Sequence, residues 1–163
     1  MSMERVEAPA PLLTWLADRP AWEATTGYDA AGWQSSTWIL HARYENPSIG
    51  GEESLDALLD TLSRCSIDGP GTDCVAFYAS LPAGDFDNPH VWRGPLSAVP
   101  ELLEERGGPY AFSATNLWPT DRSWFVWTDY DLLATKVSGA GPLVEAVKSH
   151  PALETVDWST QPR

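Results

Sequence analysis

Cysteine, histidine and basic residues are all scarce in this chain. Its 163 residues include 2 cysteines, 3 histidines and 10 lysines and arginines, against 23 aspartates and glutamates. Neither the cysteines nor the widely separated histidines have the spacing of a zinc site. We therefore expect no metal and no other cofactor. We also expect both cysteines, Cys65 and Cys74, to be small core residues.

The chain also lacks a long apolar run and a recognisable targeting signal at its start. No stretch approaches the roughly 18 consecutive apolar residues that a membrane-spanning helix needs. Residues 1–7 have neither the basic start nor the apolar stretch of a secretory signal. We therefore expect a cytoplasmic protein that does not enter a membrane.

The shortage of basic residues leaves a formal net charge of −13. A field of this sign repels nucleic acid and anionic membranes, and it raises the rate of encounter with a basic protein. An acidic surface can also serve solubility alone. The charge therefore predicts no nucleic-acid or membrane partner, and it suggests that any protein partner is basic.

Catalytic and nucleotide-binding motifs are missing as well. No Gly-Lys-Ser or Gly-Lys-Thr follows a glycine-rich loop, and no Gly-x-Ser-x-Gly nucleophile elbow occurs. Two carboxylate pairs, at residues 85 and 87 and at residues 129 and 131, could serve acid–base chemistry. Aspartates are also common in turns, where the side chain accepts hydrogen bonds from nearby backbone N–H groups. The sequence therefore favours binding over catalysis.

Apolar residues, in contrast, are abundant. They make up 43% of the chain and include nine tryptophans. That content supports one core in a chain of this length, so we expect a flexible N-terminus over residues 1–8 and one domain over residues 9–163. Tryptophan fills cores and also anchors interfaces. We expect at least six of the nine in the core.

Four segments have the apolar spacing or the boundary residues of helices. The clearest runs from Glu52 to Arg64, where leucines recur at helical spacing with carboxylates opposite. A second is capped by Ser97 and closed by glycines 107 and 108. The other two are a short helix through Leu12, Leu13, Trp15 and Leu16, and a helix introduced by residues 139–142 with Leu143, Val144 and Val147 inward.

Alternating or continuous apolar residues predict the strands. A hairpin is expected from residues 124–128 and 132–137, with Trp124 and Trp127 on opposite sides of it. Residues 82–95 have the composition of a loop. The order of these predicted helices and strands along the chain indicates a single α+β domain, whose sheet is mostly antiparallel or mixed and has the helices packed on one face. The remaining predicted strands are residues 38–44, with one mostly buried face, and residues 73–81, 110–117 and 155–158.

One segment resembles a known pattern. Residues 116–131, followed by residues 135–139, resemble a recurrent pattern in a family of small actinobacterial proteins. The most specific part is Trp-Pro-x-Asp-Arg-Ser-Trp, which residues 118–124 match as Trp-Pro-Thr-Asp-Arg-Ser-Trp. The resemblance covers roughly the last third of the chain and implies no activity. In general character, a small acidic α+β protein also resembles the immunity proteins of bacterial toxin systems, although no motif carries that comparison.

Three functions are compatible with these features. The first is a non-catalytic binding domain, immunity- or antitoxin-like, that neutralises a basic toxin through an acidic surface with aromatic anchors. The alternative is a small-ligand-binding protein or enzyme with a pocket near the 121–131 hairpin and the strand carrying His41 and Arg43. The third is a structural or regulatory subunit. The candidate partner-binding residues are Glu53, Asp56, Asp60, Glu101, Glu104, Glu105, Trp118, Asp121, Arg122, Asp129 and Asp131.

Overall fold

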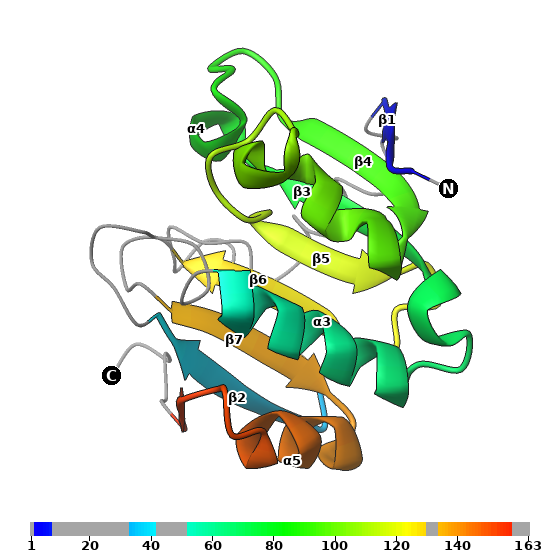
Figure 1. Cartoon of the computed structure of the whole chain (residues 1–163), viewed down its shortest axis with the longest axis vertical. Coiled ribbons are helices and arrows are strands. Elements are labelled where there is room, and N and C mark those ends of the chain that lie inside the picture. The colour runs from blue at the N-terminus through cyan, green and yellow to red at the C-terminus, as the bar shows by residue number, and fades with distance from the viewer. Residues whose placement is uncertain (1, 8–32, 42–51, 130–133, 158–163) are drawn as a thin grey trace.

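A computed structural model describes residues 2–7, 33–41, 52–129 and 134–157 (Figure 1). The strands are β1 (Glu4–Val6), β2 (Ser35–Leu40), β3 (Asp73–Tyr78), β4 (His90–Pro95), β5 (Asn116–Pro119), β6 (Phe125–Asp129), β7 (Ala134–Gly139) and β8 (Thr155–Val156). The α-helices are α3 (Glu52–Cys65), α4 (Ser80–Ala83) and α5 (Gly141–Ser149), and the 3₁₀ helices are η1 (Gly69–Gly71), η2 (Leu96–Leu102) and η3 (Glu104–Arg106).

All eight strands form one antiparallel sheet. Their order is β1-β4-β3-β5-β6-β7-β2-β8, and each neighbouring pair is antiparallel. Helices α3 and α5 lie on the same side of it, the near side in Figure 1. The predicted α+β class, with the helices on one face of the sheet, is therefore confirmed. Among the described residues, no helix is long and apolar enough to cross a membrane.

The sheet is buried on both faces. Successive residues of a strand point to opposite sides, and in β3 Ala76 and Tyr78 join one apolar cluster while Val75 and Phe77 join another. We call the first side the helix face and the second the aromatic face. The aromatic face comprises Trp38, Val75, Phe77, Val91, Trp118, Phe125, Trp127 and Ala134, with Val6, Trp33, Leu40, Ala79 and Val156 packed around them.

The best-predicted elements follow simple patterns. Helix α3 buries its leucines, including Leu58 and Leu62, against the helix face, and α5 buries Leu143 and Val147 there. The hairpin of β6 and β7 forms as predicted, with Trp124 on the helix face and Trp127 on the aromatic face. The predictions for residues 9–20 and 42–44 lie outside the described residues.

The predicted helix from Ser97 is a pair of 3₁₀ helices instead. Pro100 lies inside η2, where its missing N–H and its ring are incompatible with a continuing α-helix. Ser97 does not cap it, because the N-cap position is Pro95. Gly107 does end the segment, in the left-handed conformation that favours glycine. The expected inward residues Val99, Leu102 and Leu103 are buried.

Three strand predictions need correction. The predicted loop 82–95 contains β4, which pairs with β3 over its whole length even though it ends in Gly94 and Pro95. The predicted strand 110–117 begins only at Asn116 and extends through Trp118 and Pro119, two residues past its predicted end. Strand β2 has two buried faces, not one, because Ile39 is as buried as Trp38.

The expected flexible N-terminus contains a strand. Residues 4–6 form β1 on the edge of the sheet beside β4, and Met3 is buried in the helix-face core. Glycine permits this approach, since a Cβ at Gly94 would lie 2.7 Å from Met3 Sδ and 2.9 Å from the Ser2 carbonyl oxygen. Cys65 is also a correction: it ends α3 exposed, whereas Cys74 is buried as expected.

The tryptophans described by the structure are interior residues. Trp38, Trp118, Trp124 and Trp127 are buried, and Trp33 and Trp92 are partly buried. The last three, Trp15, Trp22 and Trp158, lie outside the described residues.

We predict that Gly108→Ala destabilises the protein by about 3 kcal/mol. A Cβ at Gly108 would lie 2.2 Å from the Leu102 carbonyl carbon and 2.3 Å from the Glu101 oxygen, so the backbone would have to move. Gly71→Ala is the control, because nothing lies within 4 Å of a Cβ there. Urea denaturation measures both, and equal stabilities would contradict the close packing of residues 101–108.

Candidate functional site

The structure brings the two predicted acidic segments together. Asp56 and Asp60 project from α3, and the carboxylates of Glu101, Glu104 and Glu105 lie on the neighbouring η2 and η3; all five are exposed. Arg106 of η3 donates two hydrogen bonds to Asp56, at 3.0 and 2.9 Å, and so ties the segments to each other. Residues 56, 60, 101, 104 and 105 therefore form one surface, which we call the acidic surface.

A groove of about 190 Å³ lies within this surface. Buried Leu59 and Leu96 form part of its lining, and the exposed Asp56, Asp60 and Ser97 contribute polar groups. Such a groove suits a lysine or arginine, whose aliphatic stem packs on apolar atoms while its charged head meets a carboxylate.

The cations of the described residues neutralise only part of the acidic surface. Asp60 pairs with Arg64 one turn along α3, and Asp56 pairs with Arg106. Within the described ranges, Glu101, Glu104 and Glu105 have no cationic partner. These three glutamates therefore add negative charge to η2 and η3, although the groove itself is lined by Asp56 and Asp60 and not by them.

The other predicted site residues do not join this surface. Trp118 is 1% exposed on the aromatic face, so its predicted role as a partner-binding anchor is wrong for this structure. Asp121 accepts a hydrogen bond from the Ser123 N–H at 2.9 Å, and Arg122 has a positive φ of 58°, which makes this segment a tight turn. Asp129 ends β6 half-buried, whereas Asp131 and the side chain of Glu53 lie outside the described parts.

The alternative pocket near the 121–131 hairpin is not assembled as the sequence suggested. The turn at 121–122 precedes β6, whereas His41 lies past the other end of the strands, where its Nε2 is 2.9 Å from Thr135 Oγ1. Arg43 lies outside the described residues. A cavity that touches Val126 and Thr128 has a volume of about 20 Å³ and mostly apolar walls. That is room for about one water molecule, not a substrate.

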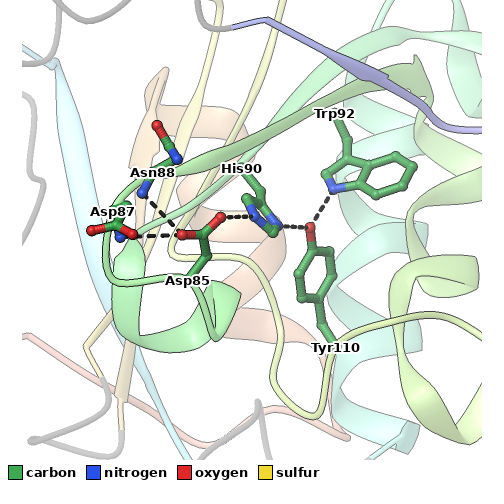
Figure 2. Close-up of polar contacts among 6 residues, drawn as sticks. All are labelled: Asp85, Asp87, Asn88, His90, Trp92 and Tyr110. Carbon is green, nitrogen blue, oxygen red and sulfur yellow. Dashed lines mark hydrogen bonds and ion pairs between the residues drawn. The ribbon is translucent and has the colours of Figure 1, made fainter.

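A second polar cluster was not anticipated from the sequence. Figure 2 shows a chain of hydrogen bonds that runs from Asp85 through His90 and Tyr110 to Trp92. Asp85 Oδ2 lies 3.1 Å from His90 Nε2, His90 Nδ1 lies 2.7 Å from Tyr110 Oη, and Trp92 Nε1 lies 2.7 Å from the same hydroxyl. The cluster links the loop before β4, β4 itself and the segment after η3.

Two groups at the ends of this chain have fixed roles, because the Trp92 indole N–H can only donate and the Asp85 carboxylate can only accept. Tyr110 Oη therefore accepts from Trp92, and His90 Nε2–H donates to Asp85. In the neutral ring with its proton on Nε2, Nδ1 is the acceptor for the Tyr110 hydroxyl proton. A neutral histidine of this tautomer satisfies all four groups at once.

The cluster resembles a catalytic relay in composition but not in access. A nucleophile needs an exposed oxygen beside its base, whereas Tyr110 is 3% exposed and stacks on Tyr78 with ring centroids 3.8 Å apart. Burial raises the pKa of Tyr110, and the Trp92 hydrogen bond opposes that shift. The hydroxyl is thus a neutral interior group that holds three segments together.

The Asp85 carboxylate also organises the loop that carries it. Its Oδ1 accepts hydrogen bonds from the N–H groups of Asp87 at 3.1 Å and Asn88 at 3.2 Å (Figure 2). The prediction that this aspartate pair serves a turn is therefore confirmed for Asp85. The hydrogen bond from His90 is the largest of the effects that lower the pKa of Asp85, followed by that from the Asp87 N–H.

Cysteine and metal chemistry find no support in the described residues. Burial, with smaller effects from Asp73 and Asp121, raises the pKa of Cys74 to about 12, which keeps its thiol protonated at neutral pH. Across residues 2–7, 33–41, 52–129 and 134–157, no three His, Cys, Asp or Glu side chains are arranged to hold a metal ion.

Comparison with protein-family models, with curated proteins and with solved structures finds no match to this chain.

We predict that Tyr110→Phe lowers the free energy of unfolding by about 2 kcal/mol. The substitution keeps the ring but leaves the Trp92 N–H and His90 Nδ1 without their shared partner. A double-mutant cycle with Trp92→Phe separates this effect from ring packing and should show a coupling of about 1 kcal/mol. Additive effects would mean that the hydroxyl does not bridge the two side chains.

We also predict a specific acid sensitivity. Because the folded-state pKa of Asp85 is below its ordinary value of 3.8, its stabilising effect is complete above that value and is lost as pH falls through the folded-state pKa. Asp85→Asn should therefore lose less stability than the wild type between about pH 4 and pH 2. Asp87→Asn, on the same loop, should follow the wild-type curve. If the stability of all three proteins falls equally with pH, protonation of Asp85 does not contribute to the loss of stability.

Proposed function

We propose that this chain is a non-catalytic, acidic protein-binding domain, and most concretely an immunity- or antitoxin-like protein that neutralises a basic toxin. The observation that carries the proposal is the acidic surface around the groove between α3 and η2. It joins carboxylates that are far apart in sequence, and three of them lack a cationic partner among the described residues. We further propose that the protein is cytoplasmic.

The arrangement fits a basic partner in two ways. Carboxylates concentrated on one face steer a positively charged protein toward that face and set its orientation. The groove then accepts a lysine or arginine side chain, whose burial at the centre of the contact would provide affinity. The predicted aromatic contribution does not come from Trp118, which is buried.

Catalysis receives less support than binding. The cluster that most resembles a relay has its hydroxyl buried and engaged by two side chains. The thiol of Cys74 is buried and protonated. The proposed similarity of residues 118–124 to an actinobacterial family also carries no activity, and in this structure Trp118 and Trp124 are core residues.

We predict that neutralising the three unpaired glutamates weakens partner binding about tenfold at low salt. Loss of each exposed charge costs about 0.5 kcal/mol, so Glu101→Gln, Glu104→Gln and Glu105→Gln together cost about 1.5 kcal/mol. The measurement is titration with the basic protein that the native host's lysate yields on low-salt capture and salt elution. Binding should also fall steeply as salt is raised.

The matched control changes the same net charge elsewhere. Glu4→Gln, Glu7→Gln and Glu154→Gln remove three exposed carboxylates near the outer strands β1 and β8. If the acidic surface is the interface, this variant binds within about twofold of the wild type. Equal weakening in both variants would mean that only net charge matters. Absence of any basic partner at low salt would reject the proposed function.

A further inference from the structure

Ile67 is an aliphatic side chain that the fold leaves in solvent. It is 98% exposed, and among the described residues Phe86, at 82%, is the only other large apolar side chain that is exposed. A single exposed apolar residue is common on protein surfaces and needs no explanation by itself. Two features distinguish Ile67 from that case: its place beside the groove and the hydrogen bonds that hold its turn.

The turn that carries Ile67 borders the groove of the acidic surface. It leads from the end of α3 into η1 (Figure 1), and Ser63 before it and Pro70 after it both line the groove. Because consecutive Cα atoms are about 3.8 Å apart, the Cα atoms of Ile67 and Pro70 lie within about 11 Å of each other. A standard interface covers about 800 Å² on each partner, which is roughly 30 Å across. A protein that places a side chain in the groove and makes a contact of this size therefore extends to the turn of Ile67.

Hydrogen bonds from the core fix the conformation of this turn. The indole N–H of Trp124 donates to Ser66 Oγ at 2.9 Å, and that hydroxyl donates to the Leu62 carbonyl oxygen at 2.7 Å. The Ser66 carbonyl oxygen in turn accepts a hydrogen bond from the Gly69 N–H at 3.1 Å, which closes the turn around Ile67. Trp124 is 1% exposed, so a core residue holds the residue that precedes Ile67.

These hydrogen bonds hold in place a side chain that adds nothing to the core, since Ile67 belongs to neither apolar cluster. An apolar group on a backbone that folding has already fixed loses less conformational entropy on binding. The same bonds connect the segment 118–124 to the surface, because its last residue, Trp124, reaches Ser66 from the core. The turn therefore presents Ile67 in one position, ready for contact with another molecule.

We propose that Ile67 is the apolar anchor of the interface with the basic partner, and that Trp124 positions it through Ser66. This inference rests on the proposed function and specifies the partner's chemistry further. The partner presents a lysine or arginine that enters the groove and, beside it, an apolar pocket that receives the Ile67 side chain. Carboxylates then steer the partner while Ile67 supplies apolar burial.

The first test compares Ile67→Ala with Phe86→Ala in titrations with the basic protein obtained by low-salt capture. Ile67→Ala should weaken binding roughly 10- to 100-fold, mainly through faster dissociation, and should keep the wild-type salt dependence because no charge is lost. Phe86→Ala is the matched control, since it removes the other exposed large apolar side chain from a loop that does not line the groove. It should bind within about twofold of the wild type. Equal effects of the two substitutions, or no effect of Ile67→Ala, would overturn the proposal.

A double-mutant cycle tests the positioning role. Ser66→Ala should weaken binding severalfold, but it should have little further effect in a protein that already carries Ile67→Ala. Ser66→Thr keeps the hydroxyl and should restore binding. A merely structural role would lower stability without this dependence on Ile67, so effects on binding that simply add would refute positioning by Trp124 and Ser66.

Failure of this inference and failure of the proposed function give different results. If neutralising Glu101, Glu104 and Glu105 weakens binding while Ile67→Ala does not, the proposed function stands and the anchor is wrong. If low-salt capture yields no basic protein, both are rejected. Ile67→Ala should also leave the midpoint of thermal unfolding unchanged, because its side chain lies in solvent. A lowered midpoint would mean that Ile67 serves the fold and not an interface.

Discussion

Burial of both faces of one antiparallel sheet is the constraint on which the rest of this structure depends. An antiparallel sheet commonly has one solvated face and shows alternating apolar and polar residues. Here every side chain of β3 after Asp73 belongs to one of two apolar clusters, and so do Phe125, Val126 and Trp127 of β6. The unusual number of tryptophans follows from this demand, because a second buried face needs large side chains to fill it.

The same constraint affects the polar side chains of the sheet, which are buried. Polar side chains inside it satisfy one another, as in the chain from Thr128 through Thr135 to His41, with oxygen and nitrogen separations of 3.1 and 2.9 Å. Buried groups paired in this way stabilise the fold and are not available to a ligand. Exposed carboxylates are found instead on the outer side of α3 and on the 3₁₀ segments. The proposed binding surface therefore lies on the layer that covers the sheet, not on the sheet itself.

The sequence predicted elements whose own pattern determines them. Helix α3 and the β6–β7 hairpin were recognisable because their apolar spacing repeats over many residues and no proline interrupts it. β4 was missed because its flanking Asp, Gly and Pro residues suggest a loop, while its strand pairing comes from β1 and β3. Local composition contains no information about such partners. The fold class was therefore predictable, and the exact membership of the sheet was not.

The candidate site was likewise predictable only in part. The acidic residues of α3 and of 101–105 could be identified from the sequence, but their meeting depends on a link between Arg106 and Asp56, 50 residues apart. The cluster at Asp85, His90, Trp92 and Tyr110 depends even more on tertiary structure, because Gly108 must fold the chain back onto Leu102 before Tyr110 can reach His90.

The fourth member of that cluster also decides its chemistry. An aspartate, a histidine and a hydroxyl joined by successive hydrogen bonds would suggest that the histidine activates the hydroxyl oxygen as a nucleophile. Trp92 occupies that oxygen with an N–H donor, and Tyr78 stacks on the ring that carries it. The same three groups that could form a relay on an exposed surface therefore act here as an internal brace. For the proposed function this brace matters indirectly, because it fixes the fold-back that follows Glu101, Glu104 and Glu105, three of the five residues of the acidic surface.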